Sequence, residues 1–182
     1  MKSLFHITIL WSGILLSVSF AQAHSRLKAS DVIKIRSTDP GVKIGPCGGF
    51  VRVAQPAVIN GGQSITVTWE ETIYHPGRFE FYFSTGGDQN FTLLKTIQNN
   101  QQGMPLPHQF STTLNIPDVN CSACTFQMIQ VMTENPANPT NYYSCADMQV
   151  KGSATAPSPT PTPAATATPS TTPTPSTGDD CH

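Results

Sequence analysis

The stretch Ile65-Thr66-Val67-Thr68-Trp69-Glu70 decides the fold. Apolar and polar side chains alternate along it, so that Ile65, Val67 and Trp69 share one face. Alternation with period two is typical of a half-buried strand. The same pattern returns in Phe79-Glu80-Phe81-Tyr82-Phe83, where three phenylalanines are expected to point inward. The sequence therefore predicts two strands that contribute their apolar faces to one core.

Weaker strand patterns follow along the chain at 91–97, 113–116, 125–132 and 146–150. Turn-forming residues separate these segments: Asn60-Gly61-Gly62, His75-Pro76-Gly77, Gly86-Gly87-Asp88, 98–102 and 135–139. Six or seven short strands without a helical period between them predict an all-β fold. The expected architecture is an immunoglobulin-like or fibronectin III-like antiparallel β-sandwich.

The first 23 residues have the pattern of a signal peptide. A short basic start precedes an apolar run over 4–20, and Ala21-Gln22-Ala23 fits the small-x-small cleavage pattern. An uncleaved membrane anchor is the alternative, although this run is short for a span of roughly 20 residues. Cleavage after Ala23 makes His24 the first residue of a secreted, periplasmic or cell-surface protein.

The other end of the chain is unlike a folded domain. Residues 153–182 are dominated by Ser, Thr, Pro and Ala, which bury too little apolar surface to order a chain. We therefore expect one folded domain over 24–152 and a disordered tail over 153–182. The net charge of −1, with charged residues making up only 12% of the chain, provides no basic surface for nucleic acid or anionic lipid.

Four cysteines lie in the expected domain and Cys181 lies in the tail. In an exported chain they indicate disulfides, and four cysteines allow three pairings. We favour Cys47 with Cys145 and Cys121 with Cys124. A zinc or redox function for the second pair is the alternative, but zinc would need another close pair of ligands.

Two histidines of the domain are candidate metal ligands. A free His24 would chelate a metal through its α-amine and its imidazole, and His75 lies on the loop between the two strongest strands. If both reach one end of the sandwich, three nitrogens suit copper, whereas zinc favours a tetrahedral site. Alternatively, His75 is an ordinary turn residue. We expect His108 to be a solvated loop residue, and no hydrolase motif is present.

Several motifs resemble a known family when taken together in chain order. They are His24, His75 with Gly77, Cys121-Ser122-Ala123-Cys124-Thr125-Phe126-Gln127 and Tyr142-Tyr143-Ser144-Cys145-Ala146-Asp147. This set is similar to lytic polysaccharide monooxygenases, especially the chitin-binding type-4-like, insect-type and bacterial polysaccharide-monooxygenase-like groups. The similarity covers 24–151.

The resemblance implies a histidine brace that holds one copper ion. His24 and His75 would be the ligands, Tyr142 would occupy the axial side, and Gln127 would position the oxygen species. The implied activity is oxidative cleavage of glycosidic bonds in an insoluble polysaccharide such as chitin or cellulose, by a monomer that receives electrons from an external donor. No membrane span is expected after signal cleavage.

Some residues depart from the family pattern and keep other functions open. Ile73 replaces a small residue two positions before the second histidine, and Trp69 is expected in the core rather than on a sugar-binding surface. The alternatives are an exported copper-binding or copper-handling protein that does not cleave polysaccharide, and a non-catalytic carbohydrate-binding surface module.

Overall fold

The computed structural model describes residues 24–153. The predicted signal peptide and almost all of the predicted tail, including Cys181, lie outside the described residues. The strands are β1 Ser25–Leu27, β2 Lys34–Ile35, β3 Ala57–Asn60, β4 Ser64–Glu71, β5 Gly77–Ser84, β6 Thr92–Asn99, β7 His108–Asn115, β8 Cys121–Met132 and β9 Thr140–Lys151. Over 24–153 there is no helix, and hence none long and apolar enough to cross a membrane.

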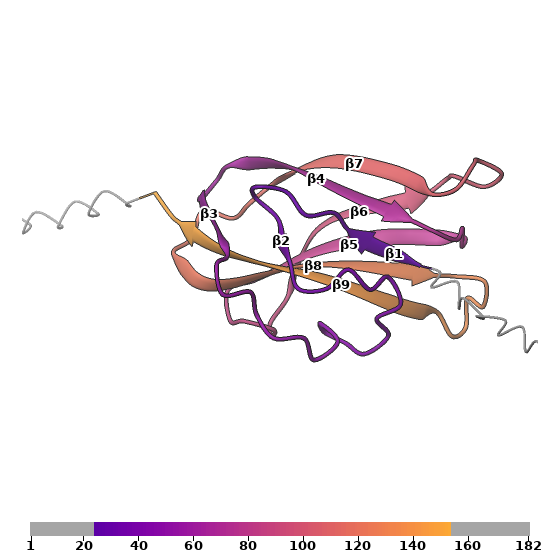
Figure 1. Cartoon of the computed structure of the whole chain (residues 1–182), viewed down its shortest axis with the longest axis horizontal. Helices are drawn as coiled ribbons and strands as arrows, with labels where there is room; N and C mark the ends of the chain where they lie inside the picture. Colours follow the sequence, from indigo (N-terminus) through magenta and orange to yellow (C-terminus); the bar gives the residue numbers. More distant parts are fainter. Residues whose placement is uncertain (1–23, 154–182) are drawn as a thin grey trace, which may run out of the picture.

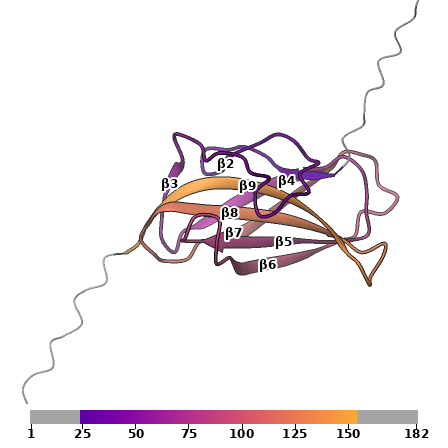
Figure 2. The same ribbon diagram turned by 90° about the horizontal axis from the view of Figure 1, so that it is seen from below.

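The strands form two sheets that pack as a sandwich (Figures 1 and 2). The small sheet has the order β1-β4-β7, and the large sheet has the order β2-β9-β8-β5-β6. All of these neighbours are antiparallel, while β3 pairs in parallel with β9. The prediction of an all-β sandwich is confirmed.

The core lies between the sheets, where the sequence pattern placed it. Trp69 of β4 and Phe79 and Phe81 of β5 are fully buried, and Phe83 is nearly so. The indole of Trp69 meets both Phe79 and Phe81 edge-on. Burial of such rings is the main favourable term for a domain of this size, so these two strands are the centre of the fold.

The long segment between β2 and β3 covers the outer face of the large sheet where β8 and β9 form it (Figure 2). The main-chain N–H groups of Arg36 and Tyr143 donate to the carbonyls of Cys145 and Val42, respectively. Because this segment covers the second face, residues 124–128 of β8 are all buried, although a strand with one covered face alternates.

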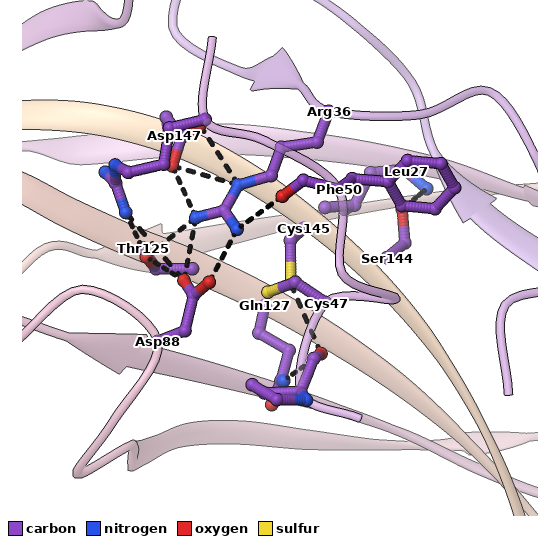
Figure 3. The surroundings of a disulfide bond; sticks show 12 residues. Leu27, Arg36, Cys47, Phe50, Asp88, Thr125, Gln127, Ser144, Cys145 and Asp147 are labelled. Atoms are coloured by element: carbon purple, nitrogen blue, oxygen red, sulfur yellow. Dashed lines mark hydrogen bonds and ion pairs between the residues drawn. A yellow bond between two sulfur atoms is a disulfide. The ribbon is translucent and has the colours of Figure 1, made fainter. Parts of the chain in front are cut away.

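A saturated ion cluster fastens this segment to the sheet. We call it the outer-face cluster; it consists of Arg36, Asp88, Thr125 and Asp147 (Figure 3) together with Arg52, which contacts Asp147 and Thr125. The guanidinium of Arg36 donates to the carboxylates of Asp147 and Asp88 at 2.7 to 3.1 Å. The Arg36 side chain is only 1% exposed and that of Asp147 is also 1% exposed. Each buried charge therefore has a partner of opposite sign.

Both predicted disulfides are present. Cys47 joins Cys145 of β9 across 98 residues of sequence, with a Cα–Cα distance of 5.6 Å. Cys121 joins Cys124 within β8. The long bridge fixes the β2–β3 segment to the outer face, and the two bridges agree with a protein folded in an oxidising compartment.

The structure differs from the sequence prediction mainly at short or extended elements. The short strands β1, β2 and β3 have too few residues to show a period, and the sequence did not predict them. In addition, β7 begins at His108 and β9 begins at Thr140, several residues before the predicted starts. The added residues do not continue a simple apolar alternation: Phe110 packs on Trp69 of the core, whereas His108 and Ser144 are buried polar residues.

Candidate metal centre

His24 lies immediately before β1, and β4 holds it in place. Ser25 pairs with Glu71, so the chain runs antiparallel to the end of β4. The N–H of Thr72 donates to the His24 carbonyl at 3.0 Å, and the main-chain nitrogen of His24 donates to Thr72 Oγ1 at 3.3 Å. The position of His24 is thus fixed by sheet pairing.

His75 reaches the same end of the sandwich from the turn between β4 and β5. Gly77 ends this turn with φ of 150°, and a Cβ there would come within 2.0 Å of the Val131 carbonyl oxygen. Only glycine allows the turn to pack this closely against β8. The imidazoles of His24 and His75 lie nearly parallel, with ring centroids 5.3 Å apart and planes 7° apart.

Tyr142 completes the group of rings. It comes from β9, and its ring stacks on His24 with centroids 3.3 Å apart and planes 14° apart. On the β2–β3 segment, the ammonium group of Lys43 lies 5.1 Å from the centre of the Tyr142 ring. The structure thus brings together three of the predicted site residues: His24, His75 and Tyr142.

The ring nitrogens of the two histidines have different partners. His24 Nδ1 is buried and has no hydrogen-bond partner among the described residues. His75 Nδ1 faces the carboxylate of Glu134, and this pairing leaves Nε2 as the nitrogen available to a ligand. A carboxylate that binds the outer nitrogen of a metal-ligating histidine fixes its ring and tautomer. Sequence analysis missed Glu134, which no motif marks.

The electrostatic surroundings keep the His24 ring neutral. Burial, then the neighbouring His75 and Lys43, lower the pKa of His24 from 6.5 to about 4. Glu134 and Asp39 act in the opposite direction and do not offset this. A neutral imidazole with an unpartnered lone pair is the form that binds a metal ion.

Gln127 does not join this group. It pairs with Cys145, whereas Tyr142 pairs with Gln130, and this odd offset puts Gln127 and Tyr142 on opposite faces of the large sheet. The Gln127 amide donates to the Pro46 carbonyl at 2.7 Å, beside the Cys47–Cys145 disulfide (Figure 3). The amide on the face of Tyr142 is that of Gln130, whose Oε1 is buried without a partner within 24–153.

His108 is buried, contrary to the expectation of a solvated loop residue. It is 4% exposed, and its Nδ1 lies 2.8 Å from Oε2 of Glu71, which is 0% exposed. The two residues are directly paired between β4 and β7. They lie behind the two stacked histidines and form a second polar layer that sequence analysis did not foresee.

The donor set fits a copper ion better than other metals. Within the described part of the chain, no group of three or more His, Cys, Asp or Glu side chains could hold a metal. His24 and His75 offer two imidazoles, and the α-amine that cleavage before His24 would release is the predicted third nitrogen. That amine and Nδ1 of the same residue can close a small chelate ring. A site made only of nitrogens suits copper.

Together, the fold and this geometry define a class of protein, a β-sandwich with two histidines brought together at one end. A family model described as "Lytic polysaccharide mono-oxygenase, cellulose-degrading" matches residues 49–148, just over half of the chain. The chain therefore belongs to the lytic polysaccharide monooxygenase family, whose members bind copper and act on polysaccharides. The matched segment contains His75 and Tyr142 but not His24.

Solved structures show partial likeness. A cellulose-active polysaccharide monooxygenase from M. thermophila has 18% identity and a TM-score of 0.46 over 68% of this chain and 64% of its own, so this chain spans less than two thirds of its length. A superoxide reductase from Ignicoccus hospitalis has 13% identity and a TM-score of 0.43, covering 74% and 86%. A lytic polysaccharide monooxygenase from Thermobia domestica has 16% identity and a TM-score of 0.42, covering 64% and 68%. No curated protein sequence matches the chain.

Proposed function

We propose that this protein is an exported, copper-dependent polysaccharide monooxygenase whose His24 and His75 form a histidine brace. The observation that carries the proposal is the buried Nδ1 of His24, which has no hydrogen-bond partner in the described chain and lies beside the His75 ring. Leaving a buried polar atom unpaired costs roughly 1 to 3 kcal/mol. A bound metal ion would remove that cost.

Each residue of the group has a definable task. His24 would contribute its amine and Nδ1, and His75 would contribute Nε2 while Glu134 holds its Nδ1. The Tyr142 ring lies against His24 and excludes water from that side. When bound, copper would supply the redox chemistry that activates oxygen or peroxide for oxidation of a C–H bond next to the glycosidic linkage.

The surface around the group suits a neutral, insoluble polymer. Ile44 follows Lys43 beside the Tyr142 ring, and it is 71% exposed. Met104, 57% exposed, belongs to the segment that binds His108 behind the site. Apolar side chains and exposed amides can contact the faces and hydroxyl groups of sugar rings. We propose chitin or a cellulose-like polysaccharide as the substrate and an external reductant as the electron source.

Copper titration tests the brace. A chain that begins at His24 is expected to bind one Cu(II) tightly, as measured by calorimetry. A matched chain that keeps Ala23 before His24 differs by one residue and lacks the α-amine on His24, so its affinity is expected to fall strongly. Equal affinity in the two chains would contradict the brace.

Product analysis tests the activity. The copper-loaded protein is incubated with chitin, cellulose or xylan and a reductant, and the soluble products are examined by mass spectrometry. Oxidised oligosaccharides are expected, and the His24→Ala variant should release none. Tight copper binding without oxidised products from any of these polymers would contradict the enzymatic part of the proposal.

That last outcome corresponds to a second candidate function, an exported copper-binding protein that does not cleave polysaccharide. A specific observation favours it: Trp69 is fully buried and Tyr142 is 3% exposed, so neither presents a ring for stacking on sugars. The copper site and the substrate surface are thus separable claims.

A further inference from the structure

Glu71 has an unusual environment for a carboxylate. It is the last residue of β4, and its side chain is completely buried, whereas the preceding Glu70 points to the opposite face and pairs with Arg26 and Lys28. Burial of a carboxylate costs several kcal/mol unless hydrogen bonds and opposite charges compensate it. Glu71 contacts the main chain of His75 and pairs with Ser25, the residue after His24. The residue with this buried carboxylate therefore lies next to both histidines in the structure.

The Glu71 carboxylate accepts hydrogen bonds from four different elements. Oε1 accepts from the side-chain amides of Asn99 at 2.8 Å and Gln130 at 2.7 Å, and from the His75 main-chain N–H at 3.3 Å. Oε2 faces His108 Nδ1 at 2.8 Å. Strands β6, β7 and β8 and the β4–β5 turn therefore all meet at one side chain.

This arrangement holds the His75 main chain on both sides of the residue. Its N–H donates to Glu71 Oε1, and its carbonyl accepts from Asn99 Nδ2 at 2.9 Å. The same Asn99 nitrogen also donates a hydrogen bond to Glu71 Oε1. Glu71 fixes one side of the turn directly and the other through Asn99.

Glu71 is also linked to His24, through the pairing of β4 with β1. Its main chain pairs with Ser25, the residue after His24, and Thr72 binds both main-chain groups of His24. One residue thus links the strand that precedes His75 with the strand that follows His24. The Glu71 main chain is therefore tied to the His24 side of the site, and its carboxylate is tied to the His75 side.

We propose that Glu71 is a positioning residue of the metal centre: its buried carboxylate fixes the His75 main chain and thereby sets the placement of the His75 ring relative to His24. This inference rests on the proposed copper site, because the placement matters only if both rings bind one ion. A ligand held in place before binding loses less entropy when the metal arrives.

A purely structural role gives different expectations. Replacing a buried ionic group with an apolar side chain of similar size is often neutral or stabilising for the fold. If Glu71 only stabilised the core, an apolar variant that folds would leave the His75 turn and copper affinity unchanged. If Glu71 positions His75, the same variant would keep its fold and lose affinity.

The test uses the chain that begins at His24 and three variants. Glu71→Leu removes all four acceptor contacts. Glu71→Gln keeps the three contacts at Oε1, because its carboxamide oxygen can accept from Asn99, Gln130 and His75, while its nitrogen takes the place of Oε2 opposite His108. Glu70→Gln is the matched control, since it changes the same residue type one position away on the opposite face.

Three quantities are measured: Cu(II) affinity by calorimetry, the electron paramagnetic resonance spectrum of bound Cu(II), and amide hydrogen exchange of His75 without metal. For Glu71→Leu we expect affinity to fall by about 10-fold to 100-fold, as for other residues that orient metal ligands, with an altered spectrum and faster His75 exchange. Glu71→Gln and Glu70→Gln should resemble the unchanged protein in all three.

Two results would overturn the inference. One is a folded Glu71→Leu protein with unchanged affinity, spectrum and His75 exchange. The other is an equal loss in Glu71→Gln, which would assign the effect to charge and not to position. If Glu71→Leu does not fold, Asn99→Ala removes the amide that binds both the His75 carbonyl and Glu71. Unchanged copper affinity, spectrum and His75 exchange in that variant would also overturn the inference.

Failure of the copper site itself would be recognisable. An unchanged protein that binds no Cu(II) contradicts the proposed function whatever the variants do. The exchange measurement needs no metal, so it reports separately on whether Glu71 fixes the His75 turn.

Discussion

The outer-face cluster and the group of rings around His24 are both partly buried polar assemblies, yet they differ in how completely their atoms are paired. The guanidinium of Arg36 binds two carboxylates and Thr125, and neither Asp147 nor Arg36 retains a free hydrogen-bonding direction toward solvent. His24 Nδ1, in contrast, has no partner in the described residues. Burial of polar groups does not by itself mark a binding site, because a fully paired cluster has no atom left to bind a ligand.

The largest effect should come from breaking the saturated cluster. Arg36→Leu leaves the buried carboxylate of Asp147 with fewer partners, and we expect it to lower the free energy of unfolding by about 3 to 5 kcal/mol. Chemical denaturation would measure the loss. Arg26→Leu, which breaks the more exposed pair with Glu70, should cost only about 0 to 1 kcal/mol. Equal losses in the two variants would remove the distinction between a saturated cluster and a surface pair.

The second largest effect is expected in the group of rings around His24, where replacing His75 should reduce copper affinity. His75→Ala should reduce Cu(II) affinity by more than about 100-fold, beyond the range expected for residues that only orient a ligand. The free energy of unfolding without metal should change little, because the His75 ring is not part of the core. Calorimetric titration and denaturation together test this. A strong loss of stability with unchanged copper affinity would reverse the roles assigned to the two regions.

A smaller loss of Cu(II) affinity is expected when Glu134, the carboxylate that faces His75 Nδ1, is replaced. Glu134→Ala frees Nδ1 of His75 and should weaken Cu(II) binding by about tenfold. Glu134→Gln retains an acceptor for the ring and should lose less. Both affinities can be obtained by competition with a chelator of known strength. If the two variants were to match the unchanged protein, Glu134 would be a solvent-exposed contact without influence on the site.

The smallest effects concern how the free energy of unfolding of the copper-free chain depends on pH. The two regions should lose stability in different pH ranges. The pKa of His24 is lowered from 6.5 to about 4, so the unfolded chain binds the extra proton first and stability falls as the pH drops from about 6.5 to about 4. Hydrogen bonding to Arg36 lowers the pKa of Asp88 below 3.8, so its contribution persists above that pH and is lost in stronger acid. Both groups are partly exposed, and solvent therefore screens these effects.

Two variants assign these two pH windows. His24→Gln should remove the decline between pH 6.5 and 4. Asp88→Asn should reduce the decline below 3.8, to which Glu70 also contributes because Arg26 lowers its pKa. Unfolding free energies measured across this range would show them. A decline above pH 4 that persists in His24→Gln would place its origin elsewhere in the chain.

The sequence predicted the centre of the fold well because the alternating pattern of β4 and β5 comes from one covered face. Trp69 and Phe79 lie in the core as expected. The pattern of β8 was less informative, since the β2–β3 segment covers its second face and most residues are buried. Alternation correctly grouped Gln127 with Ile129 and Val131, but it did not show that this face lies under that segment.

For the site, motif resemblance identified His24, His75 and Tyr142, which the structure brings together. Whether Gln127 or Gln130 shares a face with Tyr142 depends on the register between β8 and β9, and no local pattern specifies that register. Glu134 lies far in sequence from His75, and most partners of Glu71 also lie far from it in sequence. These contacts become apparent only when β4, β6, β7 and β8 and the turns between β4 and β5 and between β8 and β9 are assembled.

The position of β9 in the sheet has a consequence for how this chain acquires its fold. Strand β9 is the last in sequence, yet it lies between β8 on one side and β2 and β3 on the other. Residues 57–60 must therefore wait for residues 148–151 before they gain a hydrogen-bonded neighbour. Such distant pairing makes folding slow, and a growing chain has unpaired edges until Lys151 has been synthesised. Assembly of the large sheet is consequently a late event, completed only when nearly all of the folded region is available at once.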